Sequence, residues 1–224
     1  MGFFVKSAFE LPSAGETASL MLPAAAGQAE CLLSMPRGEV RGYAVIGHPH
    51  PLFGGAMSNK VVYTLASSAQ KVGLAALRFN FRGVGRSEGV HDNGIGEADD
   101  VLALVDILRV RWPGLPLVLM GFSFGAFVTV RAAQWAKPRA LVSIAPPFSK
   151  YVDHPVPPHP ACPWLVMHST DDEVVRYEDT VEILRGFDPP PQLVTLEGAG
   201  HFFHGRLGDI ERAVLPFLNA SLEK

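Results

Sequence analysis

Short runs of apolar residues alternate with helical patterns along most of the chain, and this alternation constrains the fold more than any other feature. Runs such as 42–47 (GYAVIG) and 115–120 (LPLVLM) are almost entirely apolar, which is typical of strands buried on both faces of a parallel sheet. Between such runs, apolar residues recur every three or four positions, as in a helix with one buried side. Strands that alternate with helices predict an α/β fold, with a mainly parallel twisted sheet covered by helices on both faces.

The pattern predicts about eight strands in a single domain that spans residues 1–224. The later strands are expected at 42–47, 74–79, 115–120, 140–145, 163–168 and 192–197, and the helices from about 58 and at 97–110, 124–135, 178–185 and 207–218. The first forty residues differ, because two short apolar runs, 17–22 and 30–34, surround a soft turn at 24–27. This part of the chain predicts an antiparallel edge to the sheet.

One serine stands at the junction of a predicted strand and a predicted helix. Residues 121–125 read Gly-Phe-Ser-Phe-Gly, follow the strand 115–120 directly and open the helix 124–135. In a strand-to-helix elbow with the pattern G-x-S-x-G, a strained turn makes the serine project above the sheet. The two glycines allow strand and helix to approach closely. Ser123 is therefore the predicted nucleophile.

A serine hydroxyl needs a base, and a group that orients the base, before it reacts at neutral pH. His201 follows Gly-Ala-Gly in the loop after the strand 192–197 and is the predicted base, with His204 as the alternative. Another candidate, His168, ends a buried strand and is interpreted as a structural histidine. In this fold class the catalytic residues follow the order serine, acid, histidine along the chain, and these candidates have that order.

The acid is one of three consecutive residues that follow the strand 163–168, namely Asp171, Asp172 and Glu173. We favour Asp172, because it lies two residues before the Val-Val pair that would start the next packed segment. The remaining acids are then first-turn charges of the following helix, where carboxylates are favourable.

Turnover also requires N–H donors for the oxyanion that forms during the reaction. One donor is expected to be the backbone N–H of Phe124, directly after the nucleophile. The second is expected from the loop 48–55, in which the prolines have no N–H to donate. Leu52 or Phe53 is the predicted donor, with Leu52 favoured.

Three motifs carry a family resemblance, HPHPLFGG at 48–55, RFNFRGVGRSEG at 78–89 and GFSFGA at 121–126. With them, the chain from about Tyr43 onward resembles the small bacterial serine α/β-hydrolases, a family of predicted hydrolases similar to dienelactone hydrolases and esterases. The resemblance implies an α/β-hydrolase fold with a minimal lid or none. One departure is Ser169, where related folds often have glycine before the acid loop.

The expected activity is cofactor-independent hydrolysis of an ester or thioester through an acyl-enzyme on Ser123, with a small acyl compound as substrate. A peptidase, acyltransferase or perhydrolase would use the same triad. An α/β-hydrolase scaffold that only binds is the alternative from a different class. The segment 146–163, rich in proline, predicts a rigid surface connection or a vestigial lid beside the site, and it is too short for a cap domain.

Five phenylalanines flank the predicted site residues: Phe53, Phe122, Phe124, Phe202 and Phe203. They form either core packing or the walls of an apolar acyl pocket, in which Phe53, Phe122 and Phe202 would bind the substrate. Arg78, Arg82 and Arg86 are either an anion clamp or, as we favour, partners of Glu97, Asp99 or Asp100 and of loop carbonyls.

A metal site could be drawn from His48 and His50 together with Asp171, Asp172 and His201. The spacing is loose, and neither an H-E-x-x-H motif nor a facing cysteine pair accompanies it. We therefore expect no metal and no cofactor.

The charge balance bears on partners and compartment. The 19 basic and 22 acidic residues give a net charge of −3 without a long basic block, so nucleic acid is not an expected partner. No apolar stretch approaches the ~20 residues that span a bilayer, and residues 1–6 lack the charged start of a secretory signal. The sequence has only two cysteines, Cys31 and Cys162, which fits a reducing compartment. We therefore expect a cytoplasmic protein. Its oligomeric state, monomer or homodimer, stays open.

Overall fold

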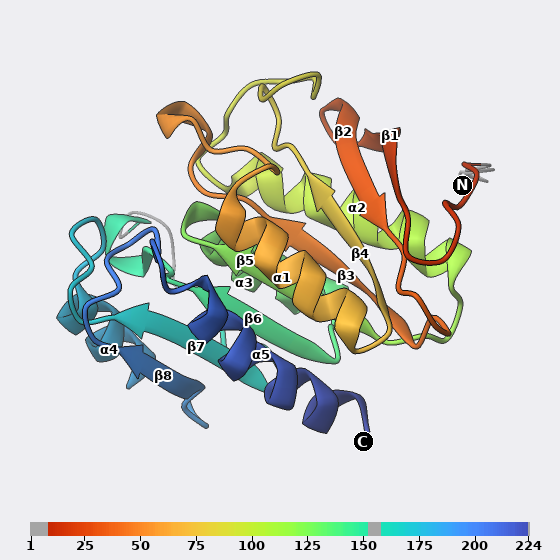
Figure 1. The fold of residues 1–224 in the computed structure, drawn as a ribbon. Coiled ribbons are helices and arrows are strands. Elements are labelled where there is room, and N and C mark those ends of the chain that lie inside the picture. Colours follow the sequence, from red (N-terminus) through yellow and green to blue (C-terminus); the bar gives the residue numbers. More distant parts are fainter. Residues whose placement is uncertain (1–8, 152–157, 224) are drawn as a thin grey trace.

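The computed structural model describes residues 9–151 and 158–223, which form an eight-stranded sheet flanked by helices (Figure 1). The strands are β1 (Thr17–Ala24), β2 (Gly27–Ser34), β3 (Gly42–Gly47), β4 (Leu74–Phe79), β5 (Leu117–Phe122), β6 (Ala140–Ile144), β7 (Trp164–Ser169) and β8 (Gln192–Leu196). The helices are α1 (Lys60–Lys71), α2 (Ile95–Arg111), α3 (Phe124–Ala136), α4 (Tyr177–Leu184) and α5 (Leu207–Leu222), with short 3-10 turns η1 (Pro51–Phe53) and η2 (Phe148–Tyr151).

The strand order in the sheet is β1-β2-β4-β3-β5-β6-β7-β8. β1 and β2 pair antiparallel, as do β2 and β4, whereas the remaining pairs from β4 to β8 are parallel. The predicted fold class is therefore confirmed, including the antiparallel edge formed by the N-terminal strands.

The central strands are apolar along their whole length because helices cover both of their faces. Every residue of β3, β4, β5, β6 and β7 is buried. Along β1, at the edge, most residues are exposed or half-buried. Continuous burial thus explains the uninterrupted apolar runs that a sheet with one solvated face would not need.

Two helical layers enclose the sheet. α1 and α5 lie side by side on one face, and α2 and α3 lie on the other (Figure 1). Leu65 of α1 and Val214 of α5 belong to one buried core, whereas Leu104 of α2 and Phe127 of α3 belong to the second. In the described part of the chain no helix has the length and hydrophobicity to cross a membrane.

Helix ends differ from the predicted ones by a few residues, for reasons of capping. α1 begins at Lys60 rather than near Ser58, because the Asn59 side chain accepts a hydrogen bond from the Val61 N–H at 2.9 Å. α2 begins at Ile95, before the predicted Glu97. The Glu97 carboxylate there accepts from the Gly94 N–H at 2.8 Å and so closes the start of the helix.

The connection between β6 and β7 has no room for a cap domain. Its described part contains the turn η2, whose Tyr151 ring stacks on Phe127 of α3 with centroids 4.3 Å apart. Residues 152–157 of the proline-rich segment lie outside the described residues. In the part of the chain that the structure describes, no helical lid covers the C-terminal ends of the parallel strands. The candidate site lies at these strand ends.

Candidate active site

Ser123 lies in the sharp turn between β5 and α3. Its backbone has φ 52° and ψ −121°, a left-handed conformation that side chains other than glycine rarely adopt. The Ser123 N–H donates to the Ile144 carbonyl at 2.8 Å and ties the turn to β6. A methyl group on Gly121 would lie 2.3 Å from the Gly125 oxygen, and one on Gly125 would lie 2.3 Å from the Gly47 carbonyl carbon. Glycine at both positions is what lets the strained turn form.

His201 connects the serine to an acid. Its Nε2 is 3.0 Å from Ser123 Oγ, and its Nδ1 is 2.8 Å from Asp172 Oδ2. The three side chains come from loops after β5, β7 and β8, whose C-terminal ends lie at the same edge of the sheet. With Asp172 accepting from Nδ1–H, Nε2 is free to accept the proton of the serine hydroxyl.

The Asp172 carboxylate is buried yet remains ionised. Burial by itself would raise its pKa, but hydrogen bonds from His168, His201 and the Val175 amide more than offset this, so the pKa lies below its ordinary value. Oδ1 accepts from the N–H groups of Val174 at 2.9 Å and Val175 at 2.6 Å. The anion therefore has a fixed orientation toward the imidazole.

The neighbouring acids bind the backbone of the histidine loop instead of the imidazole. Asp171 accepts from the Gly198 N–H at 2.6 Å, and Glu173 accepts from the His201 N–H at 2.9 Å. Among the three acids considered from the sequence, Asp172 is the one whose carboxylate contacts the His201 ring. The other two hold the loop that carries His201.

The two alternative histidines occupy different places. His204 is exposed, with its ring 5.9 Å from that of Phe202. His168 is fully buried, and its Nε2 lies 2.9 Å from the Val175 oxygen and 3.3 Å from Asp172 Oδ2. The interpretation of His168 as a merely structural histidine therefore missed its contact with the acid. The i, i+4 spacing from His168 to Asp172 was the signal that could have suggested it.

The candidate oxyanion donors are the backbone N–H groups of Phe124 and of the loop after β3. Phe124 is the first residue of α3, so its N–H has no acceptor within the helix and is available above the serine. The Leu52 N–H donates to His50 Nδ1 at 3.2 Å, and the Phe53 N–H donates to the His50 oxygen at 3.2 Å. Both predicted second donors thus have partners inside the loop. The His50 N–H has no acceptor among residues 9–151 and 158–223.

The phenylalanines divide into buried and exposed groups. Phe122, Phe124 and Phe203 are fully buried. The Phe122 ring lies against the His201 ring, with centroids 5.1 Å apart. Phe122 was expected to line a substrate pocket, but in the structure it supports His201 from within the core. Phe53 and Phe202 are exposed by 86% and 43%, respectively, and can contact a bound molecule.

The arginines of the 78–89 motif have partners within the protein. Arg82 forms an ion pair with Asp100 at 2.7 Å and also donates to the Gly96 oxygen. Arg86 pairs with Glu30 at 3.0 Å, an acid that the sequence analysis did not consider. The remaining member, Arg78, donates to the Met57 oxygen and lies over the ring of Tyr63. The expected pairing with a nearby acid is therefore found for Arg82, whose partner is Asp100. None of these contacts supports an anion clamp.

The histidine and acidic residues from which a metal site could be drawn have hydrogen-bond partners within the protein, as His48 illustrates. His48 Nδ1 lies 2.6 Å from the Pro49 oxygen, and its Nε2 accepts from the Phe81 N–H at 2.9 Å. Burial lowers the pKa of His48 to about 4, so the ring is neutral near pH 7. Within the described residues no three histidine, cysteine or acidic side chains gather as metal ligands.

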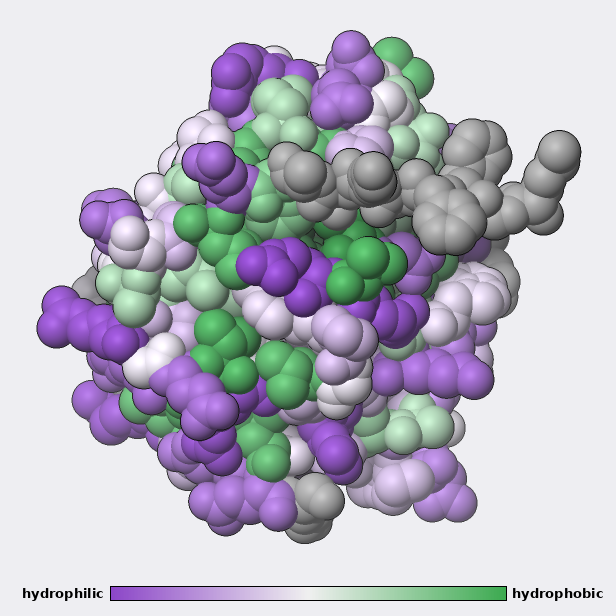
Figure 2. All heavy atoms as spheres, turned by 90° about the vertical axis from the view of Figure 1, so that its right-hand side faces the viewer, coloured by the Kyte–Doolittle hydropathy of each residue, from purple (hydrophilic) through white to green (hydrophobic). Residues whose placement is uncertain are grey.

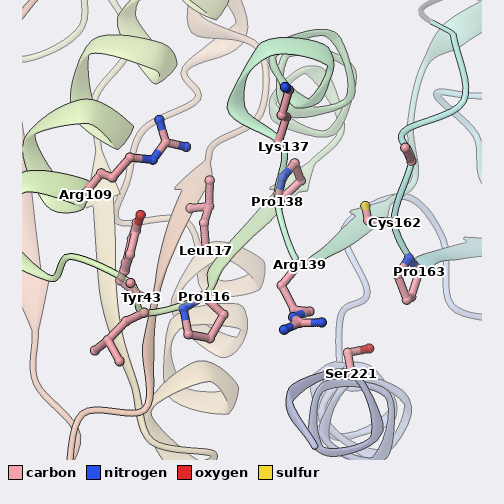
Figure 3. A pocket seen from close by; sticks show the side chains of 13 residues that line it. Tyr43, Arg109, Pro116, Leu117, Lys137, Pro138, Arg139, Cys162, Pro163 and Ser221 are labelled. Carbon is pink, nitrogen blue, oxygen red and sulfur yellow. The ribbon is translucent and has the colours of Figure 1, made fainter. Parts of the chain in front are cut away.

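The opposite end of the parallel strands, where they begin, also carries charged side chains. Figure 2 shows the molecule from this side, where hydrophilic and hydrophobic side chains are mixed. A cavity of about 460 Å³ opens near the starts of β3, β5 and β7, with Arg109, Lys137 and Arg139 on its walls (Figure 3). Arg109 donates to the Ala136 oxygen at the end of α3, and Lys137 directly follows that helix. A cation at a helix C-terminus is favourable without any ligand, so Arg109 and Lys137 do not by themselves indicate a binding site in this cavity.

Both the sequence and the fold resemble those of known proteins. Residues 52–162 match the model of a family described as serine aminopeptidase, S33. XC6422 from Xanthomonas campestris, described as an α/β serine hydrolase without lid, is 36% identical and superposes with a TM-score of 0.87, over 94% of this chain and 96% of that one. The chain belongs to a family of small bacterial serine α/β-hydrolases.

Two further similar proteins extend the comparison. An α/β serine hydrolase homologue from Coxiella burnetii is 38% identical, with a TM-score of 0.84 over 92% of this chain and 99% of that one. The uncharacterized protein RP471 of Rickettsia prowazekii (strain Madrid E) is 32% identical over 186 aligned positions, and the match covers 78% of this chain and 77% of the relative. The similarity to the two solved structures extends over more than nine tenths of each chain.

Proposed function

We propose that this serine α/β-hydrolase cleaves esters or thioesters of small acyl compounds without a cofactor. The observation that carries the proposal is the continuous hydrogen-bonded series from Asp172 through His201 to Ser123, at 2.8 and 3.0 Å. Such a series removes the proton from the serine as its oxygen attacks. A site in which the three groups met only by chance would not also hold the serine in a strained turn.

In the proposed reaction Ser123 Oγ attacks the acyl carbonyl while His201 Nε2 takes its proton. The resulting imidazolium is stabilised by the Asp172 carboxylate, and it then gives the proton to the leaving alcohol or thiol. The acyl group stays on Ser123 as an ester. Water, deprotonated by His201, attacks this ester, releases the carboxylic acid and restores the serine.

The oxyanion of each tetrahedral intermediate would be stabilised by the Phe124 N–H and by an N–H of the loop 48–55. Two amides of this loop are candidates. Leu52, favoured from the sequence, would have to release the 3.2 Å bond to His50 Nδ1, which is long for a hydrogen bond. The His50 N–H needs no such release. Preorganised donors of this kind contribute about 2.7–4 kcal/mol each.

A second candidate is suggested by the description of the matching family model, a serine aminopeptidase. An aminopeptidase must bind the free α-amino group of its substrate, usually with a carboxylate. The acids nearest the triad, Asp171 and Glu173, accept hydrogen bonds from the histidine loop. Each carboxylate thus holds the loop that carries His201, and turning it toward a substrate amino group would release that loop, which favours an ester or thioester over a peptide.

The experiment combines covalent labelling with turnover. A fluorophosphonate probe should label the wild-type protein and the control Ser58→Ala, which changes an exposed serine, but not Ser123→Ala. p-Nitrophenyl esters and an acyl thioester should be hydrolysed, and aminoacyl p-nitroanilides should not. Absence of labelling and of turnover in the wild type would reject the proposal in favour of a scaffold that only binds, and equal labelling of Ser123→Ala would mean that Ser123 is not the nucleophile. Preferential cleavage of the anilides would replace the esterase by the peptidase.

A further inference from the structure

We infer that His168 is a positioning residue for the proposed reaction, which holds the Asp172 carboxylate toward His201 by donating a second imidazole hydrogen bond to it. The inference rests on the proposed function, because it concerns the same triad. His168 is the fifth residue of β7, and Asp172 lies four residues later in the loop that follows. Neither side chain is accessible to solvent.

Four nitrogen atoms surround the Asp172 carboxylate, two near each oxygen. Oδ1 accepts from the Val174 and Val175 amides. Oδ2 lies 2.8 Å from Nδ1 of His201 and 3.3 Å from Nε2 of His168. The backbone amides alone fix one oxygen and leave the carboxylate free to rotate about it. The contact with His168 fixes the second oxygen, which is the one that must face the base.

The proton of His168 can be assigned from its surroundings. Nε2 faces two acceptors, the Val175 oxygen and Asp172 Oδ2. Nδ1 is buried and has no hydrogen-bond partner among residues 9–151 and 158–223. A proton on Nδ1 would thus be a buried donor without an acceptor, which costs more than an unused lone pair. The proton is therefore placed on Nε2, where it faces both the Val175 oxygen and Asp172 Oδ2.

This arrangement affects chemistry more than binding. The demand on Asp172 is greatest when His201 is an imidazolium, which occurs in the transition states and not in the bound substrate. Loss of the His168 donor should therefore lower kcat and leave KM unchanged. Burial raises the pKa of Asp172, but hydrogen bonds lower it below its ordinary value, and the contact with His168 is one of them.

The test is a double-mutant cycle with Asp172. His168→Met removes the donor with a side chain that fills irregular core space, and His168→Gln places an N–H donor at nearly the same distance along the side chain. We expect His168→Met to reduce kcat and the fluorophosphonate labelling rate about tenfold, as for one hydrogen bond to a charged group. His168→Gln should stay within about threefold of the wild type, since it keeps that bond.

In the Asp172→Asn background, the same His168→Met change should alter both rates less than twofold, because the group through which it acts is gone. Equal losses in both backgrounds would show a general structural role and overturn the inference, as would a wild-type rate in His168→Met alone. If His168→Met does not fold, a loss in His168→Gln as large as that of Asp172→Asn overturns it. Absence of any turnover by the wild type would instead reject the proposed function.

Discussion

Three consecutive acids in the loop after β7 have different partners, although their positions in the sequence are nearly equivalent. Asp172 binds the His201 imidazole, whereas Asp171 and Glu173 bind backbone N–H groups of the histidine loop. The sequence could place all three near His201, because each follows the same strand. Which carboxylate would face the imidazole depends on the turn after β7, and apolar periodicity does not describe that turn.

Asp172→Asn should lower kcat by about 10⁴-fold, because the amide no longer stabilises the imidazolium or its required tautomer. Asp171→Asn is the matched control, since an amide oxygen can still accept from Gly198, and it should retain kcat within a few-fold. Steady-state hydrolysis of one p-nitrophenyl ester, with thermal melting to verify folding, measures both. A larger loss of kcat in Asp171→Asn than in Asp172→Asn would mean that Asp171, and not Asp172, is the acid of the triad.

His48 predicts a pH dependence of stability that is separate from catalysis. Burial, opposed by the bond to the Pro49 oxygen, lowers its pKa to about 4, compared with ~6.5 in an unfolded chain. The unfolded state therefore binds more protons between these values, and the folded state loses stability as the pH falls from ~6.5 toward ~4.

His48→Gln removes this titration while its side-chain oxygen can still accept from the Phe81 N–H. From pH 7 to pH 5, the wild type should lose about 2 kcal/mol more of its unfolding free energy than the variant loses. Urea unfolding at the two pH values measures the difference. Identical pH dependence in both proteins would mean that His48 is already accessible to protons in the folded state.

At the level of helices and strands, the sequence predicted most of what the structure contains. The strands β3 to β7 were visible because burial on both faces favours apolar residues at most positions, and α1 and α2 were visible from the helical spacing of their apolar residues. The site residues at strand ends followed from this. What could not be predicted was which way single side chains face there. Phe122 is the last residue of β5 and lies beneath His201, whereas Phe202 in the loop is exposed, and composition does not distinguish them.

The contact of α3 with β3 allows a prediction about the elbow. In Gly125→Ala the new methyl group would meet backbone atoms of Gly47 and His48, which cannot move as a flexible side chain could. We expect a loss of about 1–3 kcal/mol or more in the free energy of unfolding and weaker fluorophosphonate labelling, because the turn at Ser123 shifts. Gly38→Ala is the control, since no atom lies within 4 Å of its added carbon. Equal melting temperatures for the two variants would contradict this account of the elbow.

At the scale of the whole molecule, the described fold places the triad at an edge with no helical cap above it, and the apolar side chains at this edge are exposed. Leu52, Phe53 and Phe202 are exposed by 70%, 86% and 43%, respectively. Phe202 contacts the His201 ring, and Phe53 contacts that of His50, which in turn lies against Phe124. These side chains are therefore the ones available to an acyl chain bound at Ser123.

Because this surface is open, it should give only a shallow preference for acyl length. A fully buried methylene contributes about 0.8 kcal/mol, and one that lies on an exposed ring contributes less, so kcat/KM should rise no more than about threefold per methylene and then level off at medium chains. Anionic half-esters should be poor substrates, since Arg82 and Arg86 are paired with Asp100 and Glu30.

The measurement is kcat/KM for acetate to decanoate esters of one phenol, followed by dicarboxylate half-esters. Phe202→Ala and Phe53→Ala should flatten the dependence on acyl length. Val110→Ala, which changes an exposed apolar residue at the end of α2, should leave it unchanged. Phe122→Leu should lower kcat for all chain lengths alike, because that ring supports His201 and does not reach the substrate. A strong preference for an anionic ester, with a flat acyl profile in the wild type, would mean that a cation reorients toward the site and that the exposed rings do not bind the acyl chain.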